Sequence, residues 1–215
     1  MDSYKDEEIK KNEIIYVPSN VKKLNFPVMT HVKKIEWDSN CIVENLGPPG
    51  FFSYYNLTQI VIPKLVKNIP SRLFEHNHFL ELVEFEKDSI LENIGDFAFA
   101  HTRIAKITFP DTVQNLGKSA LFNNKYLTEV VFNGKFIGDE AFANTGITSF
   151  KLSNNTTTIG YGAFQYCHSL KEFDIDFEKS NLSEIGQYAF YETSIDEIKI
   201  PSKVKIIKKF TFNGC

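Results

Sequence analysis

The chain has 215 residues, of which 42% are hydrophobic and 14% aromatic, so it is long enough to bury a sizeable core. Its 24 Lys and Arg residues and 27 Asp and Glu residues give a net charge of −3, too balanced for the basic surface that nucleic acid binding needs. No apolar run of about 18 residues occurs, so no membrane span is predicted.

Residues 1–13 are mostly charged and lack the apolar core of a secretory signal. We expect them to form a charged amino-terminal segment, followed by a single domain over residues 14–215. The lack of a signal favours a cytoplasmic location or unconventional export.

Apolar triplets recur after this segment, with apolar residues at positions 1, 4 and 6 of each. Positions 4 and 6 alternate as in a strand with one buried face, and β-branched and aromatic residues dominate them. Each triplet is predicted to form one strand of a parallel sheet, preceded by a partial strand at Ile15 and Val17. The triplets begin at Val32, Leu57, Leu80, Ile104, Leu127, Ile147, Leu170 and Ile195.

A second motif, Ile-Gly-x-x-Ala-Phe, is complete where it begins at Ile94, Ile137, Ile159 and Ile185. Weaker copies begin at Leu24, Leu46, Ile69, Leu116 and Ile207. The nine starts lie 21 to 26 residues apart, which is typical of a leucine-rich solenoid of about nine repeats. The motif is too short for a long helix, so we expect one helical or 3₁₀ turn on the convex side, with its Phe pointing inward.

The repeats alternate between two kinds that differ in the turn after the strand. One kind has a proline that ends the strand, because proline has no N–H for the sheet ladder, and its turn always spans seven residues. The turns of the other kind span five to ten residues, and insertions in repeat proteins often emerge on a binding face. Three of these four variable turns are acidic, although ordinary solvated turns also explain such charges. Their acids are Asp38 and Glu44; Glu86, Asp88 and Glu92; and Asp176, Glu178 and Glu184.

The three cysteines, Cys41, Cys167 and Cys215, form no metal-ligand or redox spacing. Cys167 and Cys215 share one register two repeats apart, about 9 to 10 Å if strands stack at about 4.8 Å. A disulfide needs Cα atoms within about 7 Å. The same register elsewhere holds Asn and Thr, so both cysteines are predicted to be structural turn residues.

The alternation of apolar-Pro-x-x-Val-x-x-Ile-Gly-x-x-Ala-Phe units with an intervening Cys or Asn turn resembles the BspA-like leucine-rich repeats, over about residues 14–215. The resemblance implies a right-handed leucine-rich repeat solenoid and, in some members, a surface adhesin that attaches to host or matrix proteins. We therefore expect an α/β fold, rich in β structure, with a parallel sheet on the concave face and short helical turns on the convex face.

The concave face follows from strand periodicity, because residues beside positions 4 and 6 point away from the core. Exposed apolar side chains at Val61, Leu82 and Val131 suggest a contact patch there. The alternating charges of Lys151, Asp174 and Lys199 favour a structural ladder between neighbouring strands. The predicted partner-binding residues are Glu36, Val61, Leu82, Glu84, Lys106, Thr108, Glu129, Val131, Lys151, Glu172, Asp174 and Lys199.

No nucleophile elbow, zinc-protease or dinucleotide-binding pattern occurs, so no catalytic or cofactor site is predicted and the chain is not expected to be an enzyme. His76 and His101 occupy one register in successive repeats, within about 5 Å of each other. A weak transition-metal site there is one interpretation, but no third ligand is apparent, and exposed turn histidines are the simpler one.

Two functions follow from these observations. The first is a protein-binding solenoid, which the family resemblance extends to a cell-surface adhesin; the alternative is an intracellular scaffold or structural protein. The last repeat ends at Cys215 with no strand to cover Ile207 and Phe212. We expect either end-to-end self-association, a further segment of chain, or fraying of the last turn.

Overall fold

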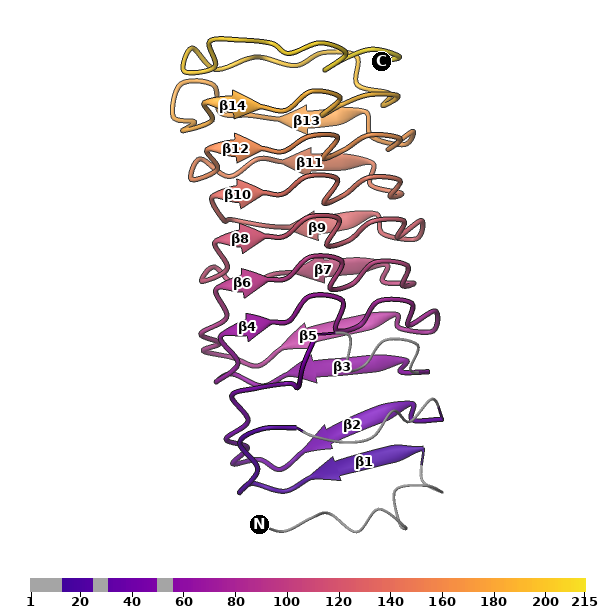
Figure 1. The fold of residues 1–215 in the computed structure, drawn as a ribbon. Helices are drawn as coiled ribbons and strands as arrows, with labels where there is room; N and C mark the ends of the chain where they lie inside the picture. Colours follow the sequence, from indigo (N-terminus) through magenta and orange to yellow (C-terminus); the bar gives the residue numbers. More distant parts are fainter. Residues whose placement is uncertain (1–12, 25–30, 50–55) are drawn as a thin grey trace.

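The computed structural model describes residues 13–24, 31–49 and 56–215, which wind into a single stack of rungs (Figure 1). The predicted charged segment therefore lies outside the described residues, except for its last position. The strands are β1 (Ile14–Val17), β2 (Lys34–Trp37), β3 (Gln59–Ile62), β4 (Asn68–Ile69), β5 (Leu82–Phe85), β6 (Asn93–Ile94), β7 (Lys106–Thr108), β8 (Asn115–Leu116), β9 (Glu129–Val131), β10 (Phe136–Ile137), β11 (Ser149–Lys151), β12 (Thr158–Ile159), β13 (Glu172–Asp174) and β14 (Glu184–Ile185).

The longer strands form the first wall of the solenoid, in the order β1, β2, β3, β5, β7, β9, β11 and β13 (Figure 1). Their pairing is parallel, and the residue at position 4 faces the core in each strand, which confirms the prediction from the apolar triplets. The partial strand predicted at Ile15 and Val17 is a full strand of four residues.

The triplet at Ile195 was predicted to be a strand, and this prediction is wrong because residues 195–200 form no strand. Two features of the segment weaken its pairing with β13. Glu197 follows Glu172 in the same column, and like charges on neighbouring strands repel. Pro201, at the end of the segment, has no N–H to donate to β13, as Pro110 has none to donate to β5. β7 is a strand nevertheless because it pairs with β9, whereas residues 201–215 contain no strand with which residues 195–200 could pair.

The alternation of the two kinds of repeat corresponds to the joining of strands in pairs. Within the pair β3 and β5, the N–H of Glu86 donates to the carbonyl of Ile62 at 3.0 Å. Pro110 holds the position of Glu86 in the next rung, and it has no N–H to offer the carbonyl of Phe85. The pairs β1–β2, β3–β5, β7–β9 and β11–β13 are separate two-stranded sheets that meet at seams. Pro63 and Pro110 stand at two of the seams, whereas Ser153 takes the proline place at the seam between β9 and β11.

A second parallel sheet forms another wall of the solenoid and was not predicted. Its six strands, in the order β14, β12, β10, β8, β6 and β4, have two residues each. Each ends on the buried Ile or Leu that begins the Ile-Gly motif. Two residues are too few to show a hydrophobic period, so the motif predicted the buried side chain but not the sheet.

The expected α/β class and the helical or 3₁₀ turns of the convex side are not observed, because residues 13–24, 31–49 and 56–215 contain no helix. The Gly-x-x-Ala-Phe segments are consecutive turns instead. Phe97 and Phe99 donate their N–H groups to the next rung, at Lys118 and Ala120, both at 2.8 Å. Ala98 donates within the turn, to Gly95 at 3.2 Å. Stacking thus gives alternate N–H groups an acceptor on the neighbouring rung, and an α-helix cannot use that acceptor.

In the described repeats the Phe of the motif points into the core, as predicted, whereas Phe51 lies outside the described residues. Phe74, Phe99, Phe142, Phe164 and Phe190 are completely buried. Successive rings along this column stack with centroids 5.2 to 5.5 Å apart. Each buried ring contributes about 1.5 to 3 kcal/mol, so the column is a main source of stability.

The two cysteines are structural turn residues, as predicted, and the three cysteines are free thiols. Cys167 is buried and contacts the hydroxyl of Thr145 in the preceding rung at 3.2 Å. Cys215 makes the matching contact with Thr193 at 3.3 Å. Residues 13–24, 31–49 and 56–215 contain no helix long and apolar enough to cross a membrane.

Candidate functional site

Within each pair of strands the predicted concave residues lie in columns, because the two strands pair without a shift in register. Lys106 pairs with Glu129, and Thr108 pairs with Val131. In the same way, Leu82 follows Gln59, and Glu84 follows Val61. The outward direction of these residues, inferred from the strand period, agrees with their exposure.

Most of the predicted site residues are exposed on this face. Leu82 and Val131 expose 38% and 46% of their surface, which is high for apolar side chains on a sheet. Glu36 and Val61 are partly buried, so their contribution to a binding surface is smaller. The exposed set is Leu82, Glu84, Lys106, Thr108, Glu129, Val131, Lys151, Glu172, Asp174 and Lys199.

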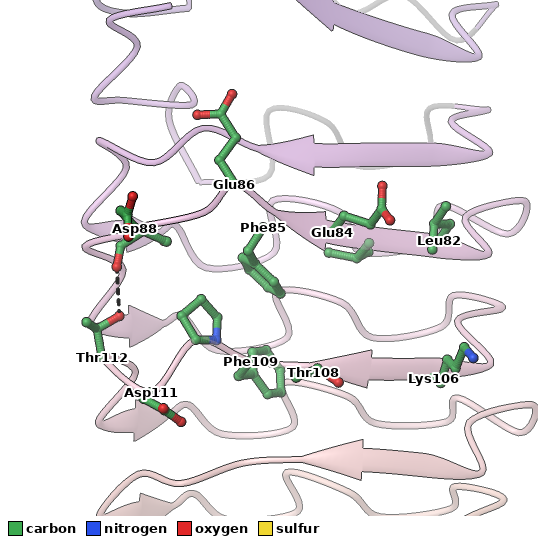
Figure 2. A pocket seen from close by; sticks show the side chains of 13 residues that line it. Leu82, Glu84, Phe85, Glu86, Asp88, Lys106, Thr108, Phe109, Asp111 and Thr112 are labelled. Atoms are coloured by element: carbon green, nitrogen blue, oxygen red, sulfur yellow. Dashed lines mark hydrogen bonds between the residues drawn. The ribbon is translucent and has the colours of Figure 1, made fainter.

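A groove of about 740 Å³ lies at the seam between β5 and β7 (Figure 2). Four predicted residues line it: Leu82 and Glu84 from β5, and Lys106 and Thr108 from β7. Figure 2 shows Leu82 and Lys106 at one end of the groove and the turn residues at the other. The groove thus joins the concave columns to a variable turn.

The turn end of this first groove combines residues from both kinds of repeat. Glu86 and Asp88 come from the variable turn after β5, and Asp111 and Thr112 come from the proline turn after β7. The hydroxyl of Thr112 donates to the carbonyl of Ser89 at 3.2 Å, which ties the two turns together (Figure 2). The two turns therefore face the groove as one connected wall.

Two of the four carboxylates of the first groove accept hydrogen bonds from neutral donors. Glu86 accepts the backbone N–H of Lys64 at 2.9 Å, and Asp111 accepts the side-chain amide of Asn133 at 2.7 Å. Within the described part of the chain, none of the groove's four carboxylates forms a salt bridge. By contrast, Glu92, the last acid of the same turn, pairs with Lys67 at 3.2 Å outside the groove.

A second groove of about 630 Å³ lies between β13 and residues 195–200. Three predicted residues, Glu172, Asp174 and Lys199, line it together with residues of another variable turn. Within that turn Asp176 pairs with Lys179 at 3.6 Å. The ammonium of Lys199 lies 5.8 Å from the ring centre of Phe177.

The remaining predicted residues, Glu36, Val61, Glu129, Val131 and Lys151, line neither groove. Glu36 pairs instead with Lys34 at 2.7 Å, and Val131 and Lys151 lie on strands between the grooves. The expected structural charge ladder is not formed as an ion pair. Lys151 and Asp174 are register partners, but no salt bridge joins them in the described structure.

Sequence reasoning missed several residues that line the grooves. Asp111 and Thr112 follow a proline and looked like ordinary turn residues. Phe177 lies in a variable turn that we interpreted from its acidic residues alone. An aromatic residue in such a turn could have indicated a binding residue. Asp196 was overlooked because it lies at position 2 of its triplet, outside both concave columns.

His76 and His101 lie together as the repeat register predicts, with ring centres 4.5 Å apart and planes at 15°. Such face-to-face stacking directs the ring nitrogens sideways, so the two rings do not converge on one ion. Nδ1 of His101 contacts the amide of Asn123 at 2.9 Å. Burial, reinforced by the neighbouring His76, lowers the pKa of His101. The described part of the chain contains no group of three or more His, Cys, Asp and Glu residues that could hold a metal ion.

The chain is similar to known leucine-rich repeat proteins in sequence and in fold. The family model of the BspA type leucine-rich repeat region matches in six copies, over residues 6–128, 44–171 and 135–215. No curated protein sequence matches significantly.

Two crystal structures illustrate the likeness of fold. A leucine-rich repeat protein of T. pallidum has a TM-score of 0.62 at 22% identity, over 84% of this chain and 77% of that one. The pneumococcal vaccine antigen PcpA has a TM-score of 0.55 at 18% identity, over 89% of this chain and 62% of the antigen chain. This chain thus spans less than two thirds of the antigen's length.

Proposed function

Since this chain belongs to the BspA-type leucine-rich repeat family, we propose that it is a non-enzymatic protein that binds a protein partner across its concave face. The observation that carries the proposal is the exposure of Leu82 and Val131 on outward columns of the concave strands. Exposed apolar groups rimmed by charged residues are typical of protein interfaces. Their strands β5 and β9 are each held by parallel pairing to a neighbour, which lowers the cost of ordering a binding surface.

We also propose that the protein acts at a cell surface as an adhesin for host or matrix proteins. The support is the resemblance of its repeats to a family with such members, together with a fold shared with a pneumococcal vaccine antigen. Labelling of intact cells with a reagent that cannot cross membranes tests this location. Labelled protein is expected, whereas protection until the cells are lysed would favour the intracellular scaffold.

The concave site is tested by the double variant Leu82→Asp and Val131→Asp. Two buried charges at an interface centre are expected to abolish capture of partner proteins, with an unchanged circular dichroism spectrum. The matched control is Phe79→Asp with Tyr126→Asp, because these side chains are 51% and 56% exposed and lie outside the concave strands. Loss of capture in the control but not in the concave variant would place the site elsewhere.

A further inference from the structure

The two grooves share one construction although they lie at different places along the solenoid. Each lies where a strand of the variable kind faces the following proline-type rung, at β5 with β7 and at β13 with residues 195–200. Each contains an acidic variable turn and an exposed apolar side chain, Leu82 at 38% in the first and Phe177 at 49% in the second.

The grooves concentrate negative charge far beyond the average of the chain. The first has four carboxylates and one lysine, a net charge of −3. The second has six carboxylates and two lysines, a net charge of −4. Together they carry −7 in a protein whose net charge is only −3, so the remaining residues of the chain are net positive. The carboxylates are Glu84, Glu86, Asp88 and Asp111 in the first groove, and Glu172, Asp174, Asp176, Glu178, Asp196 and Glu197 in the second.

Little of this charge is neutralised within the molecule. Among the described residues the only one of these ten carboxylates in a salt bridge is Asp176, which pairs with Lys179. A hollow surface lined by one sign of charge focuses its field and attracts the opposite charge. The exposed apolar side chains beside the carboxylates indicate a ligand that also carries apolar groups, as a polypeptide does.

Building on the proposed binding function of the concave face, we propose that its partner is a basic polypeptide segment that occupies both grooves. Four rungs separate β5 from β13, which is about 19 Å at the usual strand spacing. An extended segment covers this distance in about six residues. Two clusters of Lys or Arg therefore fit the two grooves, and apolar residues between them contact Val131 on the intervening rung.

The test uses fluorescent synthetic peptides and anisotropy. The probe has two Lys-Arg-Lys clusters joined by a six-residue spacer that contains leucine. The first control peptide replaces the basic residues with glutamate, and the second joins the same clusters by a two-residue spacer. We expect binding of the probe alone, with an affinity that falls steeply between low and high salt because the attraction is electrostatic.

Protein variants then assign the binding to the grooves. Glu84→Gln with Asp88→Asn removes charge from the first groove, and Asp174→Asn with Glu197→Gln removes it from the second. Each pair is expected to weaken probe binding by about tenfold, as for close charge pairs at interfaces. The charge-matched control is Glu44→Gln with Glu81→Gln, two exposed acids outside both grooves, and it is expected to change affinity less than about twofold.

Several results would overturn the basic-partner inference. If the groove variants and the control variant lost the same affinity for the probe, or if the two basic peptides bound equally well, the binding would depend on net charge alone and not on the grooves. If spermine displaced the labelled probe at the same concentration as the unlabelled probe does, the grooves would bind any polycation and not a polypeptide in particular. Partner capture that is lost in Leu82→Asp with Val131→Asp but retained in every charge variant would leave the proposed function standing and remove only this inference.

Discussion

Cys167 donates its thiol hydrogen to the carbonyl oxygen of Phe142 in the preceding rung, with 3.0 Å between sulfur and oxygen. Asn124 donates its amide in the same way to the carbonyl of Phe99 at 2.8 Å, and Cys215 donates to that of Phe190 at 3.2 Å. Burial raises the pKa of Cys167 to about 11, so the thiol remains a donor at neutral pH. One column of small polar residues thus satisfies buried carbonyls along the stack.

Phe142→Ala should lower the free energy of unfolding by about 3 to 5 kcal/mol, because the ring is completely buried and its loss leaves a cavity. Cys167→Ser should cost less than about 2 kcal/mol, since a hydroxyl can donate to the same carbonyl. Urea denaturation of the two variants measures both effects. Equal losses would mean that the polar column stabilises the stack as strongly as the aromatic one.

Asn124→Ala should destabilise the protein by about 2 to 4 kcal/mol, because the carbonyls of Phe99 and Leu121 each lose a buried donor. Asn124→Thr should be milder, since Thr145 occupies this position in the next rung and donates to the carbonyl of Phe142 at 2.8 Å. Thermal unfolding followed by circular dichroism distinguishes the two variants. A threonine variant as unstable as the alanine variant would contradict the proposed role of the donor.

Gly138→Ala should destabilise the stack by about 1 to 3 kcal/mol through overpacking. A Cβ atom at Gly138 would lie 2.6 Å from the carbonyl oxygen of Leu116 and 2.7 Å from the carbonyl carbon of Gly117. Both are backbone atoms of the preceding rung, so neither can move aside alone. The control is the opposite exchange at a buried small residue, Ala141→Gly. It measures the effect of exchanging Gly and Ala on backbone freedom without overpacking. Unchanged denaturant midpoints for Gly138→Ala would show that the rungs can separate there without cost.

Stability should fall as the pH drops below about 6.5, and His101 should contribute to that fall. Burial and His76 lower its pKa in the folded protein, so the unfolded chain binds the proton more readily. Stability is therefore fully present above the ordinary histidine pKa and is lost as the pH falls toward the lowered folded pKa. Glu75, His78 and the amide of Asn123 also face or influence the ring.

The matched variant is His101→Asn, because Asn123 and Asn144 hold the same left-handed turn position, with φ of 59° and 58° against 60° at His101. Chemical denaturation between pH 5 and pH 8 should show a smaller slope of unfolding free energy with pH for this variant. An identical slope in both proteins would assign the acid sensitivity to other groups.

The sequence by itself determined the repeat, the longer strands from β1 to β13, and the inward direction of the Phe column. These features depend on the period of side-chain burial, which is a local property of the chain. The sequence also located the polar column of Cys167 and Asn124, because the same position of successive repeats holds a small residue that can donate a hydrogen bond. The strand side of the first groove was predictable from the strand period, since Leu82, Glu84, Lys106 and Thr108 are the outward-pointing residues of β5 and β7.

The tertiary structure alone decided the conformation of the convex turns, the six-stranded second sheet and the joining of strands in pairs. Each depends on hydrogen bonds between rungs, such as that from Phe97 to Lys118, and no local pattern shows which acceptor a neighbouring rung offers. The grooves are decided in the same way. Asp88 and Asp111 line one groove because β5 and β7 meet at a seam, where Pro110 has no N–H to donate to β5 and the two turns face each other.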